Sequence, residues 1–344
     1  MNHEPDAGTA KYFRARLPMQ IATCVAVAAV ALAASMLSMK QAAAQTAGNA
    51  PDVEAFDPEV FAETHNRISN DILNEISAHE PARDLLPEKI KASGKMLWAS
   101  RIGIPPGYFL APDGKTPIGY EYTLMVAISR VLGLEPDVST FEWQTLIPSL
   151  EAGRVDAIMA LMNDTEEREQ KIDFINYIYA GLAFVIPKDN PRGLTRPEDF
   201  CGLTITSTIG GTQEAFAKQI SEKCVAAGKG PVTVMGDNNI AQAQIFVMTR
   251  RADVHITDGP SAGYSVATRP DDLELLETPE ISHSAQYGIA VRKSDDTPRE
   301  AIQAALQHLM DTGAYQKIMQ AWELDSVALD VATINAIGAV KPGV

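Results

Sequence analysis

Residues 146–179 read LIPSLEAGRVDAIMALMNDTEEREQKIDFINYIY, and this stretch decides the fold. It predicts a short helix that ends near Gly153 and then a strand over residues 154–162. A second helix is expected after Asp164, whose carboxylate suits an N-cap. Glu167, three residues later, gives a pattern like a capping box. A helix, a strand and a new helix start in close succession indicate an α/β protein.

Arg168 lies in the first turn of this second helix, where its positive charge opposes the helix dipole. An isolated Arg at such a position is usually a solvated surface charge. A planar guanidinium is also suited to bidentate binding of a carboxylate, and the free N–H groups of a helix start attract the same anion. The residues alone therefore allow a surface charge or an anion site.

The same alternation continues along the chain. Strands are expected over residues 96–103, 138–141, 182–187, 202–207, 232–235, 253–257 and 287–293, and helices over 120–132, 213–224, 240–248, 299–310 and 314–322. Strands that alternate with helices predict a parallel sheet with crossover helices.

The N-terminus has the pattern of a secretory signal peptide over residues 1–44. Basic residues between Lys11 and Arg16 precede an apolar run over 21–39, and Ala42-Ala43-Ala44 offers a cleavage site. An uncleaved membrane anchor is the rival interpretation, because the run approaches spanning length. The small residues favour cleavage before Gln45, and hence export to the periplasm if the host is Gram-negative.

Two cysteines lie beyond this segment, Cys201 and Cys224. Cys201 opens a predicted strand, and Cys224 ends the helix that follows it. An antiparallel return of the helix would bring them together, and export permits a disulfide. We expect a disulfide, with two buried thiols as the alternative.

The formal net charge is −15. Residues 1–44 contribute four basic and two acidic residues, a net of +2, so the remaining chain carries −15 − 2 = −17. This charge argues against binding to nucleic acid or to an anionic membrane. The six histidines lack chelating spacing, so we expect no metal, and no cofactor motif is present.

The order of these motifs resembles the bacterial extracellular solute-binding proteins of family 3, which bind polar amino acids for ABC importers. The resemblance covers about residues 86–325 and implies an α/β, two-lobed, type II periplasmic-binding-protein fold with a two-strand hinge near 183–187 and 287–291. It implies a first lobe over 91–187 plus 290–344 and a second over 188–289. Residues 45–90 would be a leader and an appended helix that begins at Asp57-Pro58.

The resemblance also implies an amino-acid site. Arg168 matches the family's carboxylate-binding Arg, and Asn163 falls where relatives carry a Ser or Thr donor. Gly211 and Thr212, within the segment GGTQE, match a carboxylate-binding helix start on the other lobe. Asp258 matches the acid that holds the α-ammonium, although an N-cap role is its plain alternative.

The side-chain pocket is expected to use Trp143 and Tyr108 as walls, with Thr208 at a selectivity position. His255 is expected on the other side of its strand, in a structural or solvated role. Pro105 stands where some basic-amino-acid binders have Asp. With no clear acid for a basic side chain and no second Arg for an acidic one, we expect a neutral or hydrophobic ligand side chain.

The resemblance implies a non-enzymatic periplasmic binding subunit, monomeric, that delivers an amino acid to an ABC permease and its ATPase in the inner membrane. A first alternative is a cyclohexadienyl or arogenate dehydratase on the same fold, with Glu121 or Glu142 as the general acid. A second is a sensory or accessory binding protein without transport.

Overall fold

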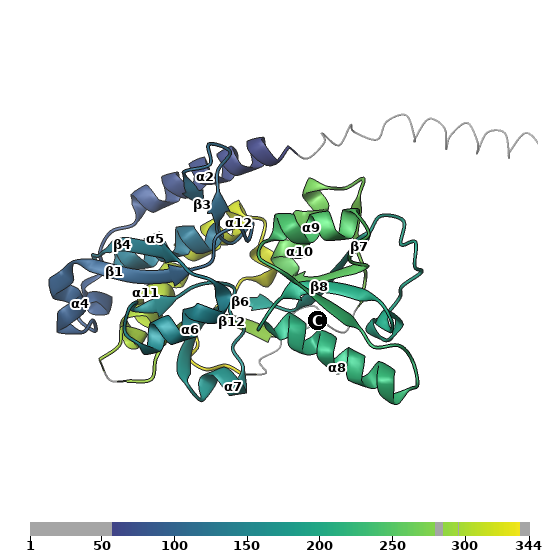
Figure 1. The fold of residues 1–344 in the computed structure, drawn as a ribbon. Helices are drawn as coiled ribbons and strands as arrows, with labels where there is room; N and C mark the ends of the chain where they lie inside the picture. The colour runs from purple at the N-terminus through teal and green to yellow at the C-terminus, as the bar shows by residue number, and fades with distance from the viewer. Residues whose placement is uncertain (1–56, 279–284, 295, 338–344) are drawn as a thin grey trace, which may run out of the picture. The chain divides into compact units, whose positions relative to one another are not determined.

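The computed structural model describes residues 57–278, 285–294 and 296–337. The predicted signal peptide and residues 45–56 of the predicted leader lie outside this part of the chain. The described residues form two five-stranded sheets, each covered by helices (Figure 1). We call the first sheet with its helices the first lobe, and the second sheet with its helices the second lobe.

The first sheet has the strand order β4-β1-β5-β12-β6. Its strands are β1 (Lys95–Ser100), β4 (Glu135–Thr140), β5 (Ala157–Ile158), β6 (Ile172–Ala180) and β12 (Ala285–Arg292). β1 is parallel to β4 and β5, as the alternation predicts, but β12 is antiparallel to both β5 and β6. The prediction of a parallel sheet therefore holds for β1, β4 and β5 and is wrong for β12, because β12 re-enters this sheet from the second lobe.

Helices cover both faces of this sheet. One face carries α2 (Pro58–Glu75), α5 (Tyr120–Val131), α11 (Arg299–Asp311) and α12 (Ala314–Ala321), and the other carries α6 (Trp143–Glu151). β1 alternates between them: Trp98 lies in the core under α5, and Ala99 lies in the core under α6. Gly133 ends the α5 segment at φ +63°, a conformation that favours glycine.

The appended helix α2 begins where the sequence predicts. The Asp57 carboxylate accepts hydrogen bonds from the Glu59 and Val60 amides and so caps the helix. Ile72 lies in the core, and the Trp322 indole donates to the Ser69 hydroxyl at 3.1 Å. α2 is therefore part of the first lobe. Shorter elements also belong here: α3 (Glu80–Arg83), α4 (Glu88–Ser93), β2 (Phe109–Leu110) and β3 (Pro117–Ile118).

The second sheet has the order β11-β7-β10-β8-β9. Its strands are β7 (Leu182–Pro187), β8 (Thr204–Thr208), β9 (Thr233–Asp237), β10 (Val254–Asp258) and β11 (Leu273–Leu275). α8 (Thr212–Ala226) covers one face, and α9 (Ile240–Met248) and α10 (Gly259–Thr268) cover the other (Figure 1). β8 is parallel to β9 and β10, whereas β7 is antiparallel to β10 and β11.

The chain passes between the sheets at Gly181, which separates β6 from β7. The strand expected at the hinge near 183–187 is an internal strand of the second sheet, and the strand expected near 287–291 is β12 of the first. The sequence analysis missed β6, which reads as a continuous buried run rather than an alternating strand. The lobe boundaries expected from the sequence remain a prediction.

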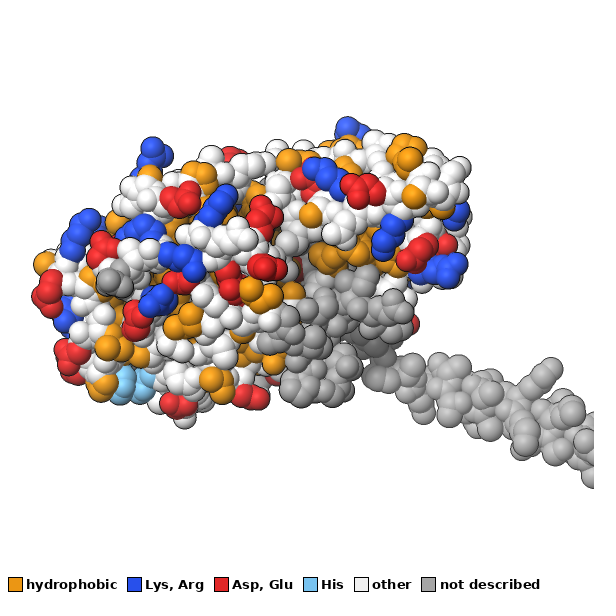
Figure 2. Space-filling model, turned by 90° about the horizontal axis from the view of Figure 1, so that it is seen from below, with side chains coloured by type: hydrophobic (Ala, Val, Ile, Leu, Met, Phe, Trp, Pro, Cys, Tyr) orange, Lys and Arg blue, Asp and Glu red, His pale blue; other side chains and the backbone are white. Residues whose placement is uncertain are grey.

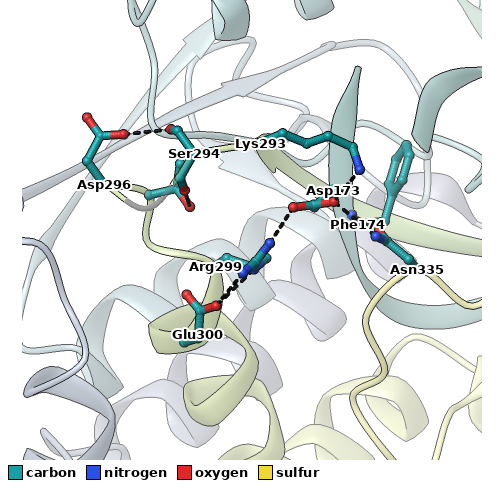
Figure 3. A network of polar contacts seen from close by, with 9 residues as sticks. Asp173, Phe174, Lys293, Ser294, Asp296, Arg299, Glu300 and Asn335 are labelled. Atoms are coloured by element: carbon teal, nitrogen blue, oxygen red, sulfur yellow. Dashed lines mark hydrogen bonds and ion pairs between the residues drawn. The ribbon is translucent and has the colours of Figure 1, made fainter. Parts of the chain in front are cut away.

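The C-terminal segment lies along β6. Ile334 forms a bridge with Ile175, and Asn335 binds both the Phe174 amide and the Asp173 carboxylate. Figure 3 shows the buried Asp173 carboxylate at the centre of a polar network. Lys293, which follows β12, and Arg299, which opens α11, complete this network. The carboxylate thus ties four separate parts of the chain together.

The surface carries both signs of charge. Figure 2 shows Lys and Arg side chains interspersed with Asp and Glu on the face it presents. Over the residues that the structure describes, no helix is both long enough and apolar enough to cross a membrane.

The predicted disulfide is confirmed. Cys201, just before β8, is joined to Cys224 near the end of α8, with the two Cα atoms 5.4 Å apart. α8 runs back along β8, so its end returns to the start of the strand. The bond therefore links the first helix of the second lobe to its sheet.

Replacing both Cys201 and Cys224 by Ser should lower the free energy of unfolding by about 3 kcal/mol, because the bond closes a loop across a sequence separation of 23. Urea unfolding of the exported chain, with and without the substitutions, measures this. An unchanged unfolding midpoint, or labelling of both residues by a thiol reagent in unreduced denatured protein, would contradict it.

Candidate functional site

Polar contacts join the two lobes along one cleft. Among the described residues, four hydrogen bonds cross it: Arg101 Nη1 to Thr208 Oγ1 at 2.9 Å, Thr212 Oγ1 to Asn163 Oδ1 at 3.0 Å, the Ile240 amide to the Gly103 carbonyl at 3.2 Å, and Gln144 Nε2 to the Ile209 carbonyl at 3.3 Å. Asn163, Thr208 and Thr212, all predicted from the sequence, thus face the cleft together.

The cleft encloses a cavity of about 30 Å³. Its walls are Arg101, Ile104, Trp143, Ala160, Leu161, Thr208, Gln213, Ile240, His255, Ile256, Thr257 and Asp258. Three predicted residues, Trp143, Thr208 and Asp258, are therefore gathered around one space. Trp143 also lines a neighbouring hollow of about 300 Å³ that includes Arg168 and Gly210.

Arg168 belongs to the short helix α7 (Glu166–Glu169) and is half-buried. Its Nη1 donates to the Asn163 carbonyl at 2.9 Å, and its guanidinium lies over the Trp143 ring, 5.3 Å from the centroid. Burial lowers the pKa of Arg168, but the group stays charged at neutral pH. A fixed cation thus stands beside the cleft wall.

The capping prediction for this turn is wrong. Thr165, not Asp164, is the N-cap, and its hydroxyl accepts from the Arg168 amide at 3.3 Å. Asp164 is buried, and its carboxylate accepts from Asn176 and from the Ala336 amide. A partner so far along the chain could not be read from the local pattern.

Asp258 lies at the end of β10 and caps α10. Its Oδ1 accepts from the Ser261 amide at 2.9 Å, so the plain N-cap alternative is correct for one oxygen. The side chain is buried, and burial raises its pKa. The same carboxylate lines the cavity and can also accept from a bound cation.

Tyr287 is a residue that the sequence analysis missed. It is buried in β12, and its hydroxyl has no hydrogen-bond partner among the described residues. Burial raises its pKa far above the usual range; the Asp258 carboxylate raises it further and the Arg168 cation lowers it. Tyr287 is therefore electrostatically coupled to both charged groups.

Gly211 and Thr212 lie at the start of α8, with Gly211 as the N-cap. Thr212 reaches Asn163 across the cleft, and Asn163 pairs with Tyr287 through a β-bridge. The helix start predicted on the second lobe thus faces the Arg168 turn on the first.

Arg101 and Asp237 form a charged pair that was also not predicted from the sequence. Arg101 directly follows β1, and its Nη2 lies 3.9 Å from Asp237 Oδ1 at the end of β9. Arg101 also lines the cavity, so a second Arg that the sequence did not lead us to expect borders it. The signal was available, because β1 ends at Ser100 and strand ends of parallel sheets border clefts.

The structure also places His255 and Tyr108 differently from the positions expected from the sequence. His255 is buried and lines the cavity, contrary to its expected place on the far side of β10. Tyr108 is buried and stacks on Tyr122 at 5.6 Å between ring centroids. It does not line the cavity or the neighbouring hollow, which Ile104 and Trp143 line instead.

Glu121 is buried behind the cavity wall. Its Oε1 accepts hydrogen bonds from the Tyr177 hydroxyl and from the Leu161 amide, the latter at 2.8 Å. Burial raises its pKa to about 7, although both hydrogen bonds oppose the shift. Leu161 has φ +51°, so Glu121 anchors an unusual backbone conformation in the wall.

A larger cavity, about 430 Å³, lies elsewhere, between α2, α10 and residues 322–327. Its walls are mostly apolar, and none of the predicted ligand-binding residues lines it. The small cleft cavity is the better candidate, because charged groups converge on it. Within the described ranges, no cluster of His, Cys, Asp and Glu could hold a metal ion.

Comparison with known proteins gives consistent matches. The profile of the bacterial extracellular solute-binding proteins, family 3, matches residues 97–325. The arginine-binding protein ArgT of Corynebacterium glutamicum is 31% identical over 255 residues, covering 73% of this chain and 81% of ArgT. The L-cystine-binding protein TcyJ of Escherichia coli is 23% identical, covering 69% of this chain and 85% of TcyJ.

Solved structures of amino-acid-binding proteins also superpose on this chain. A mutant of the arginine-binding protein ArgBP from T. maritima superposes with a TM-score of 0.61 at 29% identity, covering 70% of this chain and 99% of that one. The ancestral amino-acid-binding protein AncCDT-1, described as a precursor of cyclohexadienyl dehydratase, superposes with a TM-score of 0.60 at 25% identity, covering 68% and 98%.

Glu121→Gln should remove a pH dependence of stability. The folded pKa of about 7 is raised from 4.5, so the stabilisation is complete below pH 4.5 and is lost as pH rises through 7. Relative to Glu121→Gln, the wild type should lose roughly 3 kcal/mol of unfolding free energy between pH 4 and 8. Urea unfolding across this range measures the difference, with the exposed Glu135→Gln as control. A constant difference would contradict the raised pKa.

Proposed function

The chain belongs to the bacterial extracellular solute-binding proteins, family 3, and on this premise we propose that it binds an α-amino acid, or a close derivative, in the cleft between its lobes. The observation that carries the proposal is the placement of two opposite charges: Arg168 lies over the Trp143 ring, and Trp143 and Asp258 line the same cavity. A zwitterion is the complement of such a pair, because its carboxylate and ammonium satisfy both groups at once.

The carboxylate of the ligand would bind at Arg168. The guanidinium keeps donors beyond the one used for the Asn163 carbonyl, and its fork geometry suits a carboxylate. Thr212, at the start of the fifteen-residue helix α8, would contribute from the second lobe, whereas the Gly211 amide already donates to the Thr208 carbonyl at 3.1 Å. Trp143 would pack against the ligand from the side.

The ammonium would bind at Asp258. This carboxylate is fixed by the Ser261 amide, so it needs little ordering on binding. A buried acid with a raised pKa gains most from a cationic partner, because an opposite charge favours its ionised form. The two lobes then contribute opposite charges to the same ligand, which favours their closure.

The cellular role follows from the family. We propose export by the predicted signal peptide, a periplasmic location, and delivery of the amino acid to an ABC permease and its ATPase, with the chain acting as a monomer. The lobe division expected from the sequence, 91–187 plus 290–344 and 188–289, is part of this proposal. A sensory or accessory role would leave uptake unchanged on deletion of the gene, whereas the transport role predicts loss of uptake.

A dehydratase activity is the second candidate. Glu121 favours it, because a carboxyl with a pKa of about 7 suits general acid catalysis. Against it, this carboxyl already accepts from Tyr177 and Leu161 and is not among the groups that line the cavity. Prephenate, added to a thermal-shift screen of amino acids, separates the two: an amino-acid response alone supports binding, and turnover of prephenate supports the enzyme.

Arg168→Ala should lower affinity for the amino acid by at least about 100-fold, because it leaves the ligand carboxylate without its charged partner. Isothermal titration calorimetry on refolded protein measures this, and the exposed Arg154→Ala on the same lobe is the matched control. Near-native affinity in a folded Arg168→Ala protein would refute the carboxylate role.

Asp258→Asn keeps an N-cap for α10 but removes the charge that would hold the ammonium. Affinity for the amino acid should fall by at least about 30-fold, while affinity for the deaminated analogue with the same side chain should change little. Titrations of both ligands test this, and an equal loss for the two would rule out an ammonium contact.

A further inference from the structure

Arg101 lines the cavity, and together with Asp237 and Glu142 it also lines an adjoining hollow of about 130 Å³. Arg101 is nine-tenths buried there. Its Nη1 donates to Thr208 Oγ1 at 2.9 Å, and its Nη2 lies 3.9 Å from Asp237 Oδ1. A guanidinium has five N–H donors, and among the described residues the structure gives it this one hydrogen bond. Most of its donors are therefore open to an acceptor in the cavity.

Asp237 is the counterpart on the second lobe. It is buried, and its two carboxylate oxygens accept from Thr208 at 3.3 Å and from Thr206 at 3.2 Å. These contacts hold it in place without Arg101. The distance of 3.9 Å to Arg101 is longer than a hydrogen bond, so a group that both accepts and donates could bridge the two charges.

His255 lines the cavity and lies close to Asp237. Its Nε2 lies 3.8 Å from Asp237, and its Nδ1 is buried with no hydrogen-bond partner among the described residues. Burial lowers the pKa of His255 to about 3, so the ring is neutral at physiological pH. The buried charges here are thus Arg101 and Asp237, one cation and one anion, and the exposed Glu142 lines the same hollow.

We propose that Arg101 and Asp237 select an amino acid whose side chain ends in an uncharged amide, a primary carboxamide or a ureido group. The amide carbonyl would accept from Arg101, and the amide NH₂ would donate to Asp237. The inference rests on the proposed function, since it takes the ligand backbone to be held by Arg168 and Asp258.

The Arg101 and Asp237 charges disfavour ligand side chains that are basic, acidic or apolar. A basic side chain would place a cation beside Arg101, and an acidic side chain would place an anion beside Asp237; like charges in a buried site are strongly unfavourable. An apolar side chain would leave the remaining Arg101 donors without an acceptor in a desolvated site. A neutral amide with a donor and an acceptor fits both without a charge penalty.

Calorimetric titration of the refolded exported chain at pH 7.5 tests the proposal. The panel is glutamine, asparagine and citrulline against glutamate, arginine and methionine, which differ in charge or lack an amide at similar size. At least one amide should bind about 100-fold tighter than the last three. If arginine, glutamate or methionine binds tightest, the amide inference fails while the proposed function stands; if no amino acid binds, both fail.

Variants test the two residues directly. Arg101→Met should weaken the amide ligand by about 10- to 100-fold without weakening methionine. Asp237→Asn should move the preference from glutamine towards glutamate by at least about 10-fold. Arg192→Met is the matched control, because Arg192 pairs with Asp253 and its side chain is 58% exposed.

Arg101→Lys keeps the positive charge but loses the planar set of guanidinium donors. It is a milder change in case Arg101→Met does not fold, and it should give an intermediate loss of affinity for the amide ligand. Melting curves confirm that each variant is folded. An unchanged order of preference in folded Arg101 and Asp237 variants would overturn the assignment.

Discussion

The pairing of β6 with β12 is the interaction on which the site depends. β6 leads the chain out of the first lobe and β12 brings it back, and the two pair over their full lengths with one irregularity between Tyr287 and Gly288. The Arg168 turn is attached to the same ladder, since the Asp164 amide donates to the Gln286 carbonyl and the Gly288 amide to the Met162 carbonyl. One ladder thus fixes both the connection between the lobes and the position of the turn that carries Arg168.

The sequence predicted those helices and strands whose formation depends on neighbouring residues. Periodicity, caps and glycines located α2, α5, α8 and α9 and most strands, and the disulfide followed from a strand that leads into a returning helix. It failed where the partner is distant: the direction of β12, the cap at Thr165 instead of Asp164, and the pairing of Arg101 with Asp237. Each failure involves residues far apart in sequence, and only the strand order brings them together.

Electrostatic balance links the fold to the choice of ligand. Charges buried in the cleft cost desolvation energy, which is recovered only if each has a partner. Arg168 and Asp258 would gain their partners from a zwitterion, whereas Arg101 and Asp237 already lie 3.9 Å apart and would be bridged from the side by a neutral polar group. The proposed ligand, zwitterionic at its backbone and neutral at its side chain, would therefore leave none of these four charges without a partner.

The residues that would bind the ligand also hold the lobes together. Thr212 binds Asn163 and Arg101 binds Thr208 across the cleft, and the cavity between them has room for about one water. A ligand of amino-acid size must therefore open the lobes and break these bonds before it makes its own. Measured affinity is then the difference between ligand contacts and the interlobe contacts they replace. An amino acid that fits the cleft but makes weak contacts would therefore not be held. Only a ligand that binds Arg101, Thr208, Asn163 and Thr212 better than Arg101 binds Thr208 and Thr212 binds Asn163 can close the cleft around itself.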